Sequence, residues 1–162
     1  MQFPYKTFVR ALELATGQFQ KSRAFLNDKR LTQNEKTILA GFLSLRKCEN
    51  EEIVVALSRL SCENDFVESQ RLFCMGVAYN NLTLLPEARQ CLEKAVALNV
   101  FPEGKQRKIL AIQNLFTLYI NAKELQLARN LLPNFDEQSL LYNSFTLSTV
   151  EHDFANCSLL MP

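Results

Sequence analysis

Apolar residues recur along this chain at helical spacing, and whole pairs of such segments recur about every 34 residues. The apolar positions follow the three- and four-residue steps of one helix face, not the two-residue alternation of a half-buried strand. Only 4 Gly and 5 Pro interrupt the 162 residues, so continuous helices fit between the breaks. The pattern therefore predicts an all-α fold made of short, stacked antiparallel helix pairs.

Start and stop signals place nine expected helices on the chain. Thr32 is followed by Glu35, a capping-box pattern ahead of an apolar run. Pro86 lies in a first helical turn, where its missing N–H costs nothing, and Pro133 closes a later helix. The expected helices are residues 3–15, 18–29, 33–48, 51–61, 66–82, 86–98, 105–122, 124–132 and 137–150.

Four copies of one helix pair can be aligned, and the third copy has the clearest pattern. Its marker residues are Leu72, Met75, Gly76, Tyr79, Leu85, Ala88, Leu92 and Ala95. The residues that match Leu72 in the first, second and fourth copies are Lys6, Ala40 and Ile112. The place of Ala88 holds a small residue in all four copies: Ser22, Ala56, Ala88 and Ala128. Because Gly76 and Ala88 are small, we expect the two helices of the third copy to cross there at about 8–10 Å.

The marker residues of the third copy resemble the motif of the tetratricopeptide repeat (TPR), and the likeness covers about residues 3–135. Lys47 departs from the family pattern, which has an aromatic residue there. The step from Leu72 to Ile112 is longer than the other steps, which implies an insertion at 99–108. The resemblance implies a right-handed solenoid of about four TPR-like repeats with a C-terminal capping helix. We expect one domain over residues 1–150, with residues 151–162 as a tail or the start of a continuing segment.

The resemblance also implies a binding site, because the first helix of each pair lines the concave face in this family. The matching positions of the expected partner-binding groove are Leu45, Gln70, Phe73, Val77, Asn80, Asn81, Gln113, Thr117, Ile120 and Asn121. Some relatives grip a peptide carboxylate with Lys and Asn, but the third copy has Phe73 and Val77 at these places. Amides both donate and accept hydrogen bonds, so the Asn and Gln side chains could hold an extended peptide backbone. They could equally be ordinary solvated residues of a helix face.

Residues that carry chemistry are sparse, so we expect no enzyme, no cofactor and no metal site. His152 is the only histidine and lies near the end of the chain. The five cysteines contain no C-x-x-C pair, and the closest two, Cys62 and Cys74, belong to different expected elements. A zinc site needs about four close Cys or His ligands. The cysteines are therefore expected to be reduced and mostly buried.

The distribution of charged residues indicates which compartment and which kind of partner to expect. The longest uncharged stretch runs from Leu72 to Pro86, which is shorter than the roughly 20 residues of a membrane-spanning helix. The N-terminus lacks the pattern of a secretory signal, so we expect a cytoplasmic protein. Residues 1–47 hold nine Lys or Arg against three Asp or Glu, although the net charge is only +1. This imbalance marks either solvated helix faces or a surface that attracts an oppositely charged partner.

Together these observations predict a non-enzymatic interaction module that binds a peptide or a partner protein in its concave groove. Self-association through the apolar tail Leu159, Leu160 and Met161 would make it a homo-oligomer. The alternative is a nucleic-acid-binding helical repeat that uses the basic N-terminal half, with Lys105, Arg107 and Lys108 as a further possible phosphate contact. The irregular repeat steps and the low net charge disfavour this alternative.

Overall fold

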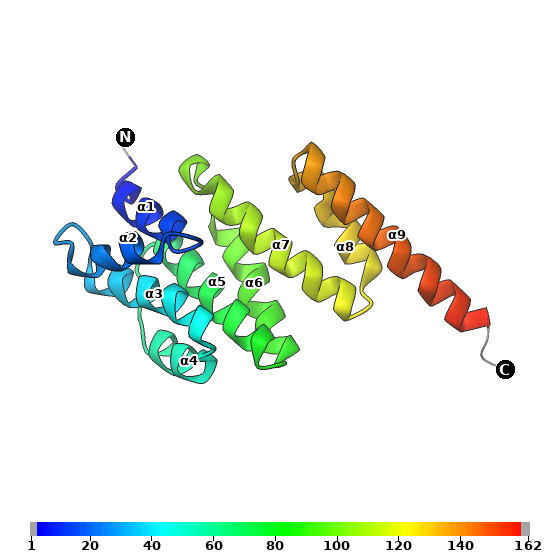
Figure 1. Ribbon diagram of the computed structural model, residues 1–162, viewed down its shortest axis with the longest axis horizontal. Helices are drawn as coiled ribbons and strands as arrows, with labels where there is room; N and C mark the ends of the chain where they lie inside the picture. Colours follow the sequence, from blue (N-terminus) through cyan, green and yellow to red (C-terminus); the bar gives the residue numbers. More distant parts are fainter. Residues whose placement is uncertain (1–2, 160–162) are drawn as a thin grey trace. The chain divides into compact units, whose positions relative to one another are not determined.

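Helices form almost all of the regular structure in the computed structural model, which describes the backbone of residues 3–159 and the side chains of residues 3–156 (Figure 1). Within this range nine α-helices and four short 3₁₀ helices occur, and no strand. The α-helices are α1 (Lys6–Leu14), α2 (Phe19–Ala24), α3 (Gln33–Ser44), α4 (Asn50–Ser58), α5 (Asp65–Asn81), α6 (Leu85–Leu98), α7 (Lys105–Asn121), α8 (Leu125–Leu131) and α9 (Glu137–Leu159). The prediction of an all-α chain is confirmed.

Eight of the nine helix starts lie within one residue of the predicted positions, whereas several predicted helix ends, such as residues 29, 48 and 61, lie beyond the observed ones. At the start of α3 the Thr32 hydroxyl accepts a hydrogen bond from the Glu35 backbone N–H at 3.2 Å, and the Glu35 carboxylate accepts one from the Thr32 N–H at 2.7 Å. This is the expected capping box. The predicted end of the last helix at Val150 is wrong, because α9 continues to Leu159. No Gly or Pro lies between Glu137 and Leu159 to stop it.

The chain divides into two compact units, Met1–Ala111 and Ile112–Pro162, with the boundary inside α7. The sequence predicts a single domain over residues 1–150. The two units are described one at a time below.

An aromatic cluster in the core of the first unit surrounds Phe66, which is fully buried at the start of α5. Its ring lies 5.1 Å from Phe3, 6.3 Å from Phe8 and 5.6 Å from Phe101 between ring centroids. Gly104, in the segment before α7, packs directly against this cluster. A Cβ there would lie 2.8 Å from the Phe66 ring, so only glycine fits without a shift. The predicted insertion at 99–108 therefore contributes to the packed interior.

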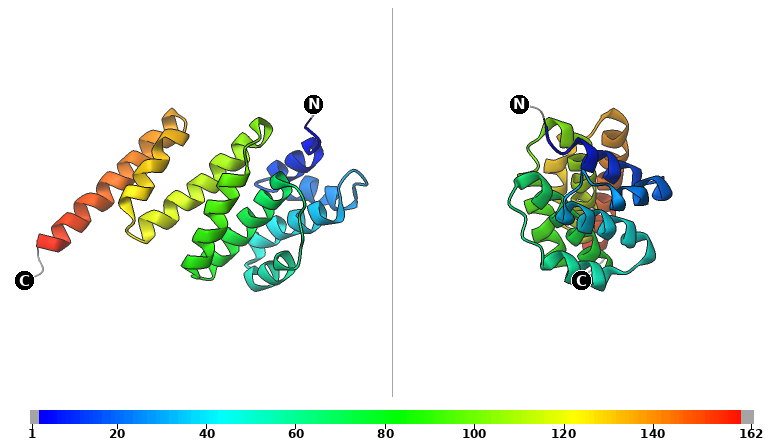
Figure 2. Two further views of the ribbon diagram at one scale, coloured as in Figure 1. Left: turned by 180° about the vertical axis from the view of Figure 1, so that it is seen from behind. Right: turned by 90° about the vertical axis from the view of Figure 1, so that its left-hand side faces the viewer.

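The helices α5 and α6 pack side by side through small residues (Figure 2). A Cβ added at Gly76 would lie 2.7 Å from Cγ of Leu92, closer than real Cβ contacts allow. Ala88 is fully buried at the same crossing. The expected close approach at Gly76 and Ala88 is confirmed.

Three small residues match Ala88 in the other copies of the helix pair, and two of the three are buried. Ser22 and Ala128 are fully buried, and the Ser22 hydroxyl donates to the backbone carbonyl of Ala11 at 2.8 Å. Ala56 is exposed instead. It lines a pocket of about 180 Å³ between α3 and α4. The second helix pair is therefore packed less tightly than the third at this place.

The turns that follow α5 and α7 have the same hydrogen bonds at equivalent places of two copies. The N–H of Leu84 donates to the carbonyl of Tyr79 at 2.9 Å, and the N–H of Glu124 donates to that of Tyr119 at 2.9 Å. Thr83 and Lys123 occupy the left-handed region with φ of 61° and 60°. The repeat found in the sequence therefore reappears in the local backbone of these two turns.

We expect Ala88→Arg to lower the free energy of unfolding by more than about 3 kcal/mol. Overpacking alone costs about 1–3 kcal/mol, and a buried, unpaired charge adds to this cost. Thermal and urea unfolding measure the effect. Ala97→Arg, at an exposed place on the same helix, is the control and should stay within about 0.5 kcal/mol of wild type. Equal stability of the two variants would show that the packing register is wrong.

Thr83→Gly should raise the free energy of unfolding by about 0.5–1 kcal/mol, because a β-branched residue is strained at positive φ and glycine is not. Urea unfolding measures the difference. The control is Ala97→Gly inside α6, which should lower stability by about 1 kcal/mol. A loss of stability in both variants would contradict a left-handed turn at residue 83.

Candidate functional site

The expected groove residues divide between the two units. Leu45 lies in the 3₁₀ helix Leu45–Lys47 after α3, and the expected residues between 70 and 81 lie on α5; all belong to the first unit. The expected residues between 113 and 121 lie on α7 and belong to the second unit. Whether all ten form one groove therefore stays a prediction.

Two of the expected groove residues on α5 are part of the interior of the first unit. Phe73 is 7% exposed, and its ring packs against that of Phe42 with centroids 5.3 Å apart. Gln70 is 3% exposed; its Nε2 donates to the Ser69 hydroxyl at 3.1 Å, and its Oε1 accepts from Nε of Arg107 at 3.1 Å. These side chains support the surface around them and offer little area of their own.

The remaining groove residues of the first unit are more accessible. Leu45, Val77 and Asn80 are half-buried, and Asn81 is exposed. The Asn81 amide donates to Oδ1 of Asn50 at 3.0 Å, which links α5 to α4. A partner that covers this part of the first unit would meet two apolar side chains and two amides.

In the second unit one predicted amide pairs with another amide. Nε2 of Gln113 donates to Oδ1 of Asn143 at 3.2 Å, and Nδ2 of Asn143 donates back to Oε1 of Gln113 at 2.9 Å. Asn143 is 1% exposed, so this pair joins α7 to α9 inside the unit. Ile120 is also buried, whereas Thr117 and Asn121 are exposed.

Arg107, which the sequence offered as a possible phosphate contact, is a buried cation. Its side chain is 3% exposed, and Nη2 has no hydrogen-bond partner among the described residues. The guanidinium carbon lies 4.6 Å from the Phe42 ring centroid and 5.2 Å from that of Phe73. Burial lowers the pKa of Arg107 to about 10. The idea that Lys105, Arg107 and Lys108 together contact phosphate is wrong, because Arg107 faces the interior.

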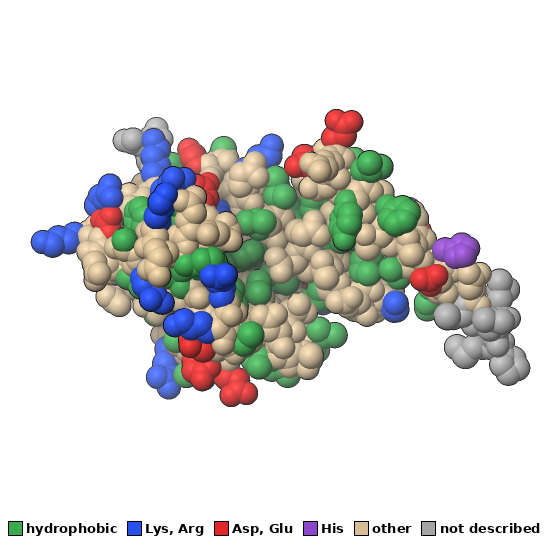
Figure 3. Space-filling view, in the orientation of Figure 1, with side chains coloured by type: hydrophobic (Ala, Val, Ile, Leu, Met, Phe, Trp, Pro, Cys, Tyr) green, Lys and Arg blue, Asp and Glu red, His purple; other side chains and the backbone are tan. Residues whose placement is uncertain are grey.

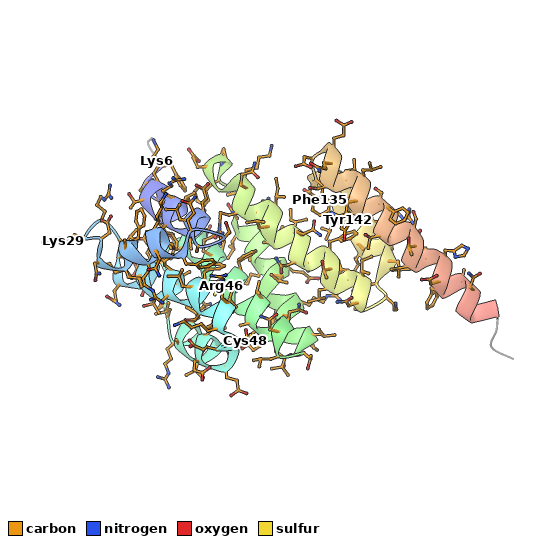
Figure 4. The ribbon with its side chains drawn as sticks, viewed as in Figure 1. Lys6, Lys29, Arg46, Cys48, Phe135 and Tyr142 are labelled. Atoms are coloured by element: carbon orange, nitrogen blue, oxygen red, sulfur yellow. The ribbon has the colours of Figure 1, made fainter. Side chains whose placement is uncertain are left out.

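An apolar face on α9 is a surface feature that the sequence did not predict. Leu141, Tyr142 and Phe145 are 75%, 70% and 73% exposed, and Phe145 follows the other two by about one helical turn. We call these three residues the α9 face. Figure 3 shows green side chains at the surface of the second unit, and Figure 4 labels Tyr142 on α9. A capping helix needs a polar outer face. The predicted capping role of this helix does not fit the α9 face.

The described residues contain little reactive chemistry. His152 is exposed on α9, with Nδ1 3.1 Å from Nδ2 of Asn156. Between residues 3 and 156 no cluster of three His, Cys, Asp or Glu could hold a metal ion. No helix in the described part of the chain is both long enough and apolar enough to cross a membrane. The tail residues proposed for self-association lie outside the described side chains.

Comparisons with known proteins add no family assignment. A scan against protein-family models, a search of curated proteins and a search of solved structures each found no match.

The cysteines differ in burial, which predicts their order of reaction with iodoacetamide in the native protein. Cys48 is exposed, Cys62 and Cys91 are half-buried, and Cys74 is buried. Burial, followed by the charge of Glu68, raises the pKa of Cys62 to about 11, and burial also raises the pKa of Cys74. Because the thiolate is the reacting form, Cys48 should react first, Cys62 slowly and Cys74 last.

Mass spectrometry of the alkylated protein measures this order. The rate at Cys62 should keep rising as the pH passes 9 toward 11, since its thiol stays protonated longer than an ordinary one. In a denaturing concentration of urea, the differences in alkylation rate between these cysteines should vanish. Native Cys74 that reacts as fast as Cys48 would contradict the packing of α5.

Proposed function

We propose that this chain is a non-enzymatic protein–protein interaction module, built as a right-handed solenoid of TPR-like helix pairs. The repeated turns after α5 and α7 and the small-residue crossing of α5 and α6 support this assignment. The partner is a protein or a peptide segment, held by exposed apolar side chains and by the accessible part of the expected groove. A second copy of the chain is one possible partner.

The α9 face is the observation that carries the proposal. A monomer rarely leaves several large apolar side chains uncovered together unless the surface has a partner. Covering a Leu, Tyr or Phe side chain contributes about 1.5–3 kcal/mol each. The three side chains of the α9 face therefore supply enough stabilisation for a central contact, with polar neighbours as its rim.

The accessible part of the expected groove on the first unit offers a second binding area, independent of the α9 face. Leu45 and Val77 provide apolar contacts there, and Asn80 provides an amide. Phe73 and Gln70 are buried in the interior of the first unit. A variant at Phe73 would therefore damage the fold before it reports on binding, so the α9 face is the better place to test the function.

Phe145→Glu should remove the partner from the protein captured out of a lysate of the source cells. The charge would have to be desolvated in the contact, which costs several kcal/mol when it is unpaired. Quantitative mass spectrometry of the bound proteins, with light scattering of the purified chain for self-association, measures the loss.

The matched control is Val100→Glu, which makes the same change at a side chain that is 70% exposed and lies outside the α9 face. This variant should keep the partner. Both variants should retain wild-type circular dichroism, because both residues are exposed. Equal recovery of all bound proteins by the two variants would show that the α9 face is not the binding surface.

A further inference from the structure

Four basic side chains line a group of adjoining hollows on the first unit, between α2 and the C-terminal end of α3. Lys21 and Arg23 lie on α2, and Arg46 and Lys47 lie in the 3₁₀ helix after α3. The central pocket has a volume of about 210 Å³ and is lined by Phe19, Gln20, Arg23, Leu43, Arg46 and Lys47. We call this surface the basic groove.

The basic groove continues into two neighbouring hollows. One of about 90 Å³ shares Arg23, Leu43 and Lys47 with the central pocket and adds Leu26. The other, of about 490 Å³ beside the turn before α2, shares Phe19 and Arg46 and adds Lys21. The apolar floor is formed by Phe19, Leu43 and Leu26, while all four cations are exposed at the rim.

Arg46 is held at the rim by an aromatic ring. Its guanidinium carbon lies 3.4 Å from the centroid of the Phe19 ring, a cation–π contact worth about 0.5–1 kcal/mol at an exposed site. The contact restricts the side chain and leaves its N–H groups for a ligand. It also covers one face of the Phe19 ring, so that face is not free to stack on a nucleic-acid base.

The positive charge of the basic groove is not neutralised within the described part of the chain, where none of its four cations forms an ion pair. The three acidic residues of the first 47 are engaged elsewhere. Asp28 pairs with Arg30 at 2.7 Å, Glu35 caps α3, and Glu13 lies 4.0 Å from Arg10. None of these three carboxylates therefore pairs with a cation of the basic groove.

We propose that the basic groove docks an acidic segment of a partner protein, with Asp or Glu on either side of one large apolar side chain. The carboxylates pair with the rim, where the forked guanidinium groups of Arg23 and Arg46 fit them bidentately. The apolar side chain enters the hollow between Phe19 and Leu43. A phosphate backbone would leave this floor uncovered, which favours a peptide over a nucleic acid.

This inference names a partner chemistry for the proposed interaction module but uses a surface distinct from the α9 face. Phe145→Glu should leave binding at the basic groove unchanged. Failure of one proposal is therefore distinguishable from failure of the other.

The test is a selection of random displayed peptides on the wild-type protein, with peptides that also bind the Arg46→Glu variant removed. The selected peptides should carry Asp or Glu on both sides of Leu, Met or Phe. Measured by fluorescence anisotropy with the full chain, Arg46→Glu should weaken their binding about tenfold or more, which corresponds to about 1.4 kcal/mol.

Lys29→Glu is the matched control, because it makes the same charge change at an exposed lysine that lines none of the three hollows. Figure 4 shows Lys29 well away from Arg46. Its effect should stay below about twofold, as expected for an exposed charge outside the contact. Unchanged melting temperatures of both variants establish that the fold is intact.

Three outcomes would overturn the proposal. The first is a selection that yields no acidic peptide sensitive to Arg46→Glu. The second is a mixed-sequence single-stranded RNA that displaces the selected peptides and binds more tightly than they do. The third is self-association of the chain that Arg46→Glu abolishes, which would make a second copy, through its acidic α4, the occupant.

Discussion

A single pair of antiparallel helices cannot enclose its own apolar face, so each pair in this chain depends on contact with a neighbour. The helix α5 meets this need most completely, with buried residues from Phe66 to Ala78 on several sides. Gly76 lets α6 approach one side, and Gly41 lets α3 approach another, since a Cβ there would lie 3.1 Å from Sγ of Cys74. At α9 the same requirement is unmet, and the three side chains of the α9 face stay exposed.

Buried polar groups also need a partner, in their case a hydrogen-bond partner. The amides of Gln70 and Gln113 were expected to face a partner, and each instead satisfies a buried group of its own unit: Arg107 in one case and Asn143 in the other. A buried polar group without a partner costs about 1–3 kcal/mol. These internal hydrogen bonds therefore stabilise the packing of the helices, and the binding we propose uses the exposed apolar and basic side chains instead.

The sequence predicts the helices well because their signals are local. The capping box of Thr32 is recognised from a residue one turn away. The close crossing at Gly76 and Ala88 is recognised from small residues on two consecutive helices. The long α9 was predictable too, since nothing between Val150 and Leu159 breaks a helix.

The candidate sites were less predictable because they depend on how each helix is rotated. Arg107 lies four residues before the buried Ala111 and eight before the buried Leu115, so helical spacing does place it on the inner face. The expected groove positions come from the family resemblance, which does not fix whether a side chain such as Gln113 turns inward. The basic groove is built by two helices far enough apart in sequence that no local pattern joins Phe19 to Arg46.

The central claim, that the α9 face is covered by a protein in the working state, has a direct measurement. The photo-reactive residue benzoylphenylalanine replaces Phe145 in one sample and Val100 in another, and both are irradiated in a lysate of the source cells. The account predicts a discrete protein adduct, or a dimer of the chain, from position 145 and none from position 100. No adduct from position 145, or the same adducts from both positions, would contradict it.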